Sequence, residues 1–371
     1  MGFFTKKAQG VVLIDIGSAS VGGAYLCVRE NQPPLLCYTA RIPVSIREKE
    51  TVTEAMLRAL DTLCKQLITE GAPALYREAG DAHIEMVLAT VAAPWQETIV
   101  RTVTLEERYK FVFTRHLMER AVRANAPITG RTITDTSIIS TKLNGYETDN
   151  PWNKHTDRAD LTVLTSTIDT DVVASITKTL RASFHSHHLE IAAFAPIAYS
   201  VVANLYPLQK DFVVIDVSGT ATDVLLVRHG VIASVRSLSL GVAHLSPPEP
   251  RSMDTLSTRM TKHATDAREL AEGRWLLELR RVLAESATEN PLPSTIFLLA
   301  DEDSRTYLKE LIDTSTLRSL WLSSDPLALI PLAPEHTSSV VRVRGLAEGD
   351  VFLSMLALFY QDRLSTKKVA G

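Results

Sequence analysis

Two short stretches of the chain place an aspartate at the end of an apolar run and follow it with small residues. The first is DIGSAS at residues 15–20, and the second is DVSGTATD at residues 216–223. Small residues let the backbone N–H groups of a turn come close to an anion, and a neighbouring carboxylate can hold Mg²⁺. The two stretches therefore predict a site for a phosphate group. The competing interpretation is that both aspartates only cap turns through side-chain hydrogen bonds.

Both stretches are predicted to be the tips of β-hairpins. The segment 11–28 reads as a strand, a Gly/Ser turn and a second strand, and the segment 212–241 repeats this order and adds a third strand. Asp15 matches Asp216 when the two are aligned. Such a duplication suggests two related lobes that face each other, although two unrelated hairpins would give the same local pattern.

The composition is that of a folded protein with more than one lobe. At 371 residues the chain exceeds one ordinary core, and 45% hydrophobic with 22% charged residues argues against extensive disorder. The net charge of −4 gives no general attraction to nucleic acid or anionic lipid. Cys27, Cys37 and Cys64 show no C-x-x-C spacing, so they indicate buried thiols in a reduced, cytosolic protein rather than a zinc site.

No segment reads as a secretory leader or a membrane span. The first ten residues lack an apolar core, and the longest apolar run, at 191–203, is too short to cross a bilayer and contains Pro196. We expect a soluble protein that reaches a membrane through a partner or through a peripheral patch.

The segments between the hairpins complete the predicted first lobe. Helical spacing at 51–71 predicts a helix that Gly71 ends. A strand-helix-strand-strand block at about 95–168 is predicted to be a module inserted into this lobe. A helix at 170–184 and an apolar segment at 189–205 then return the chain to it.

The segments after the second hairpin alternate between polar loops and buried elements. A loop at 246–252 precedes a long helical region at 254–286 with a charged, solvated face. A buried strand, an acidic turn and a helix follow in STIFLLADEDSRTYLKELI, and the last helix is apolar nearly all round. The predicted boundaries are lobe 1 at 1–94 and 169–208, the inserted module at 95–168, lobe 2 at 209–350, and a C-terminal helix and tail at 351–371.

These motifs resemble the actin-like ATPase superfamily and, within it, the bacterial PilM and FtsA group. DIGSAS resembles its first phosphate hairpin, DVSGTATD its second, HLEIAAFAPIAYSVVANL its connecting helix region and STIFLLADEDS its adenosine motif. The inserted block matches in position the SHS2-type subdomain that FtsA and PilM carry and actin lacks. The resemblance implies an α/β, actin-like (ribonuclease H-like) fold of two lobes with ATP and Mg²⁺ between them.

Within the group, the resemblance to PilM is the stronger one. The opening MGFFTKK and the short spacing from Asp216 to Ala300 are PilM-like, and LSTKKVAG follows the last helix where FtsA has a linker and a membrane helix. LNGYETDNPW is instead similar to FtsA.

The resemblance also implies which residues would contact a nucleotide. Asp15 and Asp216 would lie on the Mg²⁺ side. The remaining positions of the three loops would surround the phosphates and the adenosine: Gly17, Ser18, Ser20, Ser218, Gly219, Thr220, Asp223, Ala300 and Ser304.

The same loops depart from the family pattern in ways that weaken such a site. Ser218 and Thr220 occupy glycine positions and Ala221 replaces a threonine. The most changed loop is the adenosine motif, where a Gly-Gly turn is replaced by Ala300, Asp301, Glu302 and Asp303. The added carboxylates would repel an anionic ligand.

The connecting segment lacks the acid that the family uses there. Its position is taken by Ala192, with Glu190 shifted by two residues. We therefore expect weak binding of ATP and Mg²⁺ at most, weak or no ATPase activity, and no catalytic residue.

Two other groups of residues invite a functional interpretation. His185, His187 and His188 could suggest a metal, but such a cluster before a strand is typical of a solvated turn. Trp95 and Trp152 flank the inserted block, and packing in a core or hinge is favoured over docking.

The resemblance implies a cytosolic scaffold protein of a membrane-associated assembly machine. On the PilM interpretation it would bind the cytosolic tail of a bitopic inner-membrane protein in a groove beside the inserted block, lie at the inner membrane face through that partner, and self-associate. On the FtsA interpretation it would link a tubulin-like filament to the membrane. A phosphotransferase of the same superfold is a third alternative.

Overall fold

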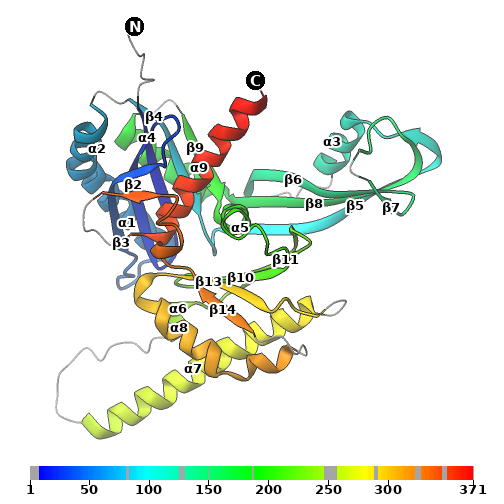
Figure 1. The fold of residues 1–371 in the computed structure, drawn as a ribbon. Coiled ribbons are helices and arrows are strands. Elements are labelled where there is room, and N and C mark those ends of the chain that lie inside the picture. The colour runs from blue at the N-terminus through cyan, green and yellow to red at the C-terminus, as the bar shows by residue number, and fades with distance from the viewer. Residues whose placement is uncertain are drawn as a thin grey trace.

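The computed structural model describes residues 8–80, 83–124, 130–148, 150–185, 188–245, 257–287, 291–321, 327–344 and 349–370. The loop predicted at 246–252 lies outside these residues. Two mixed sheets form two lobes, and a third sheet forms an arm that projects sideways from them (Figure 1).

The first lobe is built on a six-stranded sheet with the order β15-β3-β2-β1-β4-β9. Its strands are β1 (Gln9–Ile16), β2 (Ser20–Val28), β3 (Leu35–Pro43), β4 (Ile84–Val91), β9 (Leu189–Ala193) and β15 (Arg342–Val343). Its helices are α1 (Val52–Gln66), α2 (Ala72–Ala79), α4 (Thr170–Phe184), α5 (Phe194–Leu205) and α9 (Val351–Ala370). Strand β1 is apolar from Val11 to Ile14 because both of its faces are covered there: Val12 and Ile14 pack toward α1 and α4, and Val11 and Leu13 pack toward α5 and α9.

Helix α1 starts as predicted but does not end at Gly71. Thr51 and Glu54 form a reciprocal capping box at its start. The chain then continues through one π-helical turn, Leu67–Gly71, directly into α2. A Cβ atom at Gly71 would lie 2.5 Å from the Tyr25 ring. Gly71 is therefore a close-packing residue rather than a stop signal, and the prediction that it ends the helix was wrong.

The second lobe repeats the arrangement on a five-stranded sheet with the order β12-β11-β10-β13-β14. Its strands are β10 (Phe212–Val217), β11 (Thr222–Arg228), β12 (Val231–Leu238), β13 (Thr295–Ala300) and β14 (Ala328–Pro331). Its helices are α6 (Val242–Leu245), α7 (Ser257–Ser286) and α8 (Glu302–Thr314). One face of the sheet packs on α7 and α8 around the fully buried Trp275.

The two lobes share one apolar core. Phe212 and Phe297 of the second sheet pack in the same cluster as Phe194 of α5 and Phe352 of α9. The chain also crosses back to the first lobe before residue 350, because β15 pairs in parallel with β3. The lobes therefore meet through packed side chains as well as through the two hairpins.

The arm is a four-stranded sheet with the order β5-β8-β6-β7. Its elements are β5 (Gln96–Val112), α3 (Arg115–Ala124), β6 (Arg131–Leu143), β7 (Tyr146–Glu147) and β8 (His155–Asp169). Helix α3 lies at the far end of the arm (Figure 1), over a small core that includes Val103, Phe113 and Leu161. Both tryptophans pack as predicted: Trp95 is buried and donates to Thr53, and Trp152 stacks on Phe113 with ring centroids 5.7 Å apart.

Candidate functional site: a cleft closed by its own side chains

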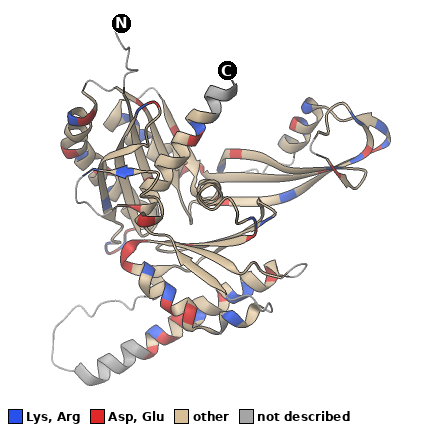
Figure 2. Ribbon diagram, viewed as in Figure 1, with Lys and Arg blue, Asp and Glu red and all other residues tan. Residues whose placement is uncertain are grey.

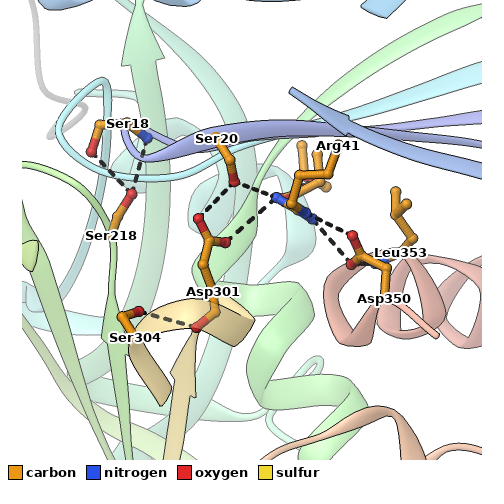
Figure 3. A network of polar contacts seen from close by, with 10 residues as sticks. Ser18, Ser20, Arg41, Ser218, Asp301, Ser304, Asp350 and Leu353 are labelled. Carbon is orange, nitrogen blue, oxygen red and sulfur yellow. Dashed lines mark hydrogen bonds and ion pairs between the residues drawn. The ribbon is translucent and has the colours of Figure 1, made fainter. Parts of the chain in front are cut away.

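The tips of the two hairpins touch across the cleft between the lobes. The backbone N–H of Ser18 donates to Ser218 Oγ at 3.0 Å, and the two serine hydroxyls lie 3.0 Å apart (Figure 3). The backbone N–H of Thr220 donates to Ser18 Oγ at 2.9 Å. In a phosphate-binding turn such N–H groups would point at the anion. Here the hydroxyl of the opposite turn accepts from them.

The backbones of the two turns also lie in contact. A Cβ atom built on Gly219 would lie 2.5 Å from the carbonyl oxygen of Ser18. Gly17 lines a cavity of about 20 Å³ that remains between the hairpins, together with Asp15 and Asp216. That volume holds about one water molecule, because a water needs roughly 10–15 Å³ by this measure. No phosphate chain fits between the turns in this arrangement.

The three hairpin aspartates are buried and hold their protons more tightly than usual. Burial raises the pKa of Asp15 to about 6, although Arg41 counteracts it. Burial raises the pKa of Asp223 to about 6 as well, against hydrogen bonds from Ser237 and Gln96. Burial, and then the nearby Asp223, hold the pKa of Asp216 well above its ordinary value. Within the described ranges the Asp216 carboxyl forms no hydrogen bond or ion pair.

A guanidinium occupies the centre of the cleft. Arg41, on β3, forms ion pairs with Asp350 at 2.7 Å, with Asp15 at 3.0 Å and with Asp301 at 3.6 Å. It also donates to Ser20 Oγ at 2.7 Å, and that hydroxyl donates to Asp301 at 2.8 Å (Figure 3). Burial would lower the pKa of Arg41, but Asp350 and Asp15 raise it above its ordinary value. One fixed cation thus neutralises carboxylates from both lobes.

Arg41 and Asp350 are the residues that the sequence interpretation missed, and both leave a signal in the sequence. Arg41 lies opposite Gly22 across β2 and β3, and a Cβ atom at Gly22 would lie 2.5 Å from its guanidinium. A glycine inside a strand often marks such a close approach. Asp350 directly precedes α9 and accepts from the N–H of Leu353 at 3.1 Å, which is the role of a helix N-cap.

The acidic loop after β13 is arranged differently from the expectation. Asp301 turns toward the first lobe and bonds to Ser20 and Arg41, so part of the negative charge expected of this loop is compensated from the other lobe. The side chains of Glu302 and Asp303 are exposed. Ala300 is buried at the end of β13, and the hydroxyl of Ser304 donates back to the Asp301 carbonyl within its own turn.

The other candidates do not join the cleft. Glu190 forms an ion pair with Arg363 of α9, and Ala192 lies in β9 opposite Thr90. His185 ends α4 in the left-handed conformation, and His187 lies outside the described residues. Across the described ranges no group of three or more His, Cys, Asp or Glu side chains could hold a metal ion.

A groove runs between the base of the arm and the second lobe. Its volume is about 370 Å³, and its two walls are the start of β5 and the end of β12. Each of these strands is at the edge of its sheet, so each has backbone groups that no neighbouring strand pairs. Gln96 and Ser237, from opposite walls, both donate to the Asp223 carboxylate.

The distribution of charge adds no further site. Lys and Arg residues alternate with Asp and Glu along α7 and the arm (Figure 2). Among the helices that the structure describes, none is long and apolar enough to cross a membrane.

Comparison with known proteins supports the fold. No protein-family model matches the chain, and no curated protein sequence matches it. The structure is similar to a chain of the PilM-PilN type IV pilus biogenesis complex, with 18% identity over 95% of this chain and 98% of that one and a TM-score of 0.64. This likeness confirms the predicted two-lobed, actin-like fold.

Two other solved structures align over most of the chain with lower scores. One is a Bacteroides thetaiotaomicron protein with an actin-like ATPase fold and unknown function, at 12% identity, 97% and 99% coverage and a TM-score of 0.43. The other is the ethanolamine utilization protein EutJ from Carboxydothermus hydrogenoformans, at 13% identity, 95% and 90% coverage and a TM-score of 0.41.

Proposed function

We propose that this chain is a PilM-like adaptor of a type IV pilus assembly machine, which binds the cytosolic tail of a bitopic inner-membrane protein and turns over no nucleotide. The observation that carries the proposal is the likeness in fold to the PilM-PilN complex, which spans 95% of this chain. Docking to such a partner brings the chain to the inner face of the membrane through the partner's own membrane span.

The geometry of the cleft favours an adaptor over a phosphotransferase. A phosphotransferase needs an open site for Mg²⁺–ATP, and the residues here do not fit that ligand. The turns are bonded to each other, the cavity between them is about 20 Å³, and Arg41 stands among the carboxylates. Binding of Mg²⁺–ATP is therefore weak or absent.

The groove beside the arm is suited to an extended peptide. A peptide strand added along the exposed edge of β5 or of β12 would find unpaired backbone groups there, which is how β-strand addition gives affinity. The walls also carry charged side chains, among them Glu97, Arg131 and Arg236, that would select the sequence of the tail. We place the partner's tail in this groove.

The test uses a synthetic peptide with the sequence of the cytosolic tail of the bitopic protein encoded beside this chain's gene. Titration calorimetry with the full chain is expected to give saturable binding. Arg236→Glu, on the exposed side of β12 in the groove, should weaken it at least tenfold, because one wall changes the sign of its charge. The matched control is Arg274→Glu, an exposed change on α7 in the same lobe, which should leave the affinity unchanged.

Liposome sedimentation provides a second test. The chain should stay in the supernatant unless the tail peptide is anchored to the vesicle. Sedimentation of the chain alone with anionic vesicles would overturn the adaptor proposal in favour of the FtsA-like alternative. Failure of the tail peptide to bind in calorimetry would overturn the assignment of the partner.

A further inference from the structure

We infer that the chain carries internal substitutes for the nucleotide and its cation, and that these hold the two lobes closed at all times. The substitutes, here called the latch, are the hydroxyls of Ser18 and Ser218 between the turns and the guanidinium of Arg41 among three carboxylates. The inference rests on the proposed function, because the role we give to a closed cleft is to fix the shape of the groove in which the partner's tail would bind.

The serine pair occupies the position of a phosphate group. The N–H groups of Ser18 and Thr220 belong to turns that resemble phosphate-binding hairpins in sequence, and each donates to a hydroxyl oxygen of the opposite turn. The contact joins residues 200 positions apart in the chain, one on each lobe. A nucleotide phosphate would have to displace both hydroxyls and separate the backbones at Gly219.

Arg41 takes the part of the cation. Its guanidinium joins Asp15 of the first hairpin, Asp301 of the second lobe and Asp350 at the start of α9. Asp15 is 4% exposed, so its carboxylate cannot rely on water for compensation. A side-chain cation cannot dissociate as Mg²⁺ can, so the positive charge among these carboxylates is permanent.

The latch also fixes the groove in which we place the partner. Asp223 lies opposite Asp216 in the second hairpin and accepts from Gln96 and Ser237, which belong to the two walls of that groove. Separation of the lobes would therefore change the distance between β5 and β12. A locked cleft keeps the walls at one spacing and preorganises the groove, which lowers the free-energy cost of binding a peptide.

The test is a distance measurement between the lobes by pulsed electron spin resonance. Spin labels are attached at Thr62→Cys on α1 and Glu310→Cys on α8; both positions are exposed, and the three native cysteines are buried. The chain with an intact latch should give one narrow distance distribution. Addition of about 5 mM Mg²⁺–ATP, which would saturate even a weak site, should leave this distribution unchanged. Arg41→Ala should lengthen and broaden the distribution.

Two control variants and a second test variant accompany this measurement. Arg305→Ala removes a second arginine, which lines with Arg41 a cavity of about 270 Å³. The Arg305 side chain forms no hydrogen bond or ion pair in the described part of the chain, so this change should leave the distances unchanged. Arg41→Lys keeps the charge and should largely restore the narrow distribution. Asp350→Asn keeps a helix cap but removes one charge, and it should broaden the distribution even where Arg41→Ala fails to fold.

The outcomes separate the latch from the proposed function. An unchanged distribution in both Arg41→Ala and Asp350→Asn, or a shift of the unmodified chain on addition of Mg²⁺–ATP, would overturn the latch. A narrow, nucleotide-independent distribution upholds it even when the tail peptide does not bind. Peptide binding by a chain with a broad distribution would uphold the adaptor function and overturn the latch.

Discussion

Ser18 and Ser218 bond to each other across the cleft, with their hydroxyl oxygens 3.0 Å apart and 200 residues between them in the chain. Each lies in the turn of a hairpin that follows a buried aspartate, Asp15 in one lobe and Asp216 in the other. The two turns therefore satisfy each other's hydrogen-bonding groups, and the cleft is a contact between lobes rather than an open site.

The serine pair should show energetic coupling. Ser18→Ala and Ser218→Ala should each lower the free energy of unfolding by about 1 kcal/mol, because each leaves a donor without its acceptor. The double variant should lose about 1 kcal/mol less than the sum, since the two hydroxyls share one set of contacts. Urea unfolding of the four proteins measures this. Additivity to within about 0.3 kcal/mol would show that the pair does not interact.

Two glycine substitutions should have effects of opposite sign. Gly219→Ala puts a Cβ atom 2.5 Å from the Ser18 carbonyl oxygen, so it should force the turns apart and lower the thermal midpoint. Gly273→Ala lies inside α7 with nothing within 4 Å of the added atom. It should raise stability by about 0.5–1 kcal/mol through helix propensity. Calorimetric scans compare the two. Equal tolerance of both changes would contradict the contact between the turns.

The acidic loop should respond differently at its first two positions. Asp301→Gly removes a carboxylate that bonds to Ser20 and Arg41, so it should destabilise the chain and broaden the distance between the lobes. Glu302→Gly removes an exposed side chain that lines, with Arg41 and Asp301, a cavity of about 270 Å³, and it should leave that distance unchanged. The distance between the lobes in both variants can be measured by electron spin resonance with spin labels at positions 62 and 310. Equal effects of the two changes would mean that Asp301 does not join the lobes.

The pH dependence of stability should reveal Asp223. Burial raises its pKa in the folded chain to about 6, whereas an ordinary Asp carboxyl titrates near 4 in an unfolded chain. The folded state binds this proton more tightly, so the stabilising contribution is full below about pH 4 and is lost as the pH rises through 6. Asp223→Asn removes this titration. Relative to the unmodified chain, its free energy of unfolding should therefore rise by roughly 2–3 kcal/mol between pH 4 and pH 7. A difference that stays constant across this range would show that Asp223 is not the titrating group.

The sequence predicted the arrangement of strands and helices better than the side-chain contacts in the cleft. The short apolar run around Leu13 and Ile14, bounded by a Gly/Ser turn, predicted a buried strand, and the matching positions of Asp15 and Asp216 predicted that two hairpins face each other. Local pattern could not show that Arg41 reaches Asp301 and Asp350, because the pairing depends on how distant segments pack. The same limit explains why the sequence did not show that Arg41 partly compensates the charge of Asp301.

The most direct test of the central claim is titration calorimetry of Mg²⁺–ATP into the unmodified chain, followed by an assay of phosphate release. The cleft is filled by Ser18, Ser218 and Arg41, so we predict no saturable heat up to about 1 mM ligand, a limit of roughly 4 kcal/mol in binding free energy, and no turnover. Saturable binding in the micromolar range with release of phosphate would contradict the account, because it would mean that these side chains give way to a nucleotide.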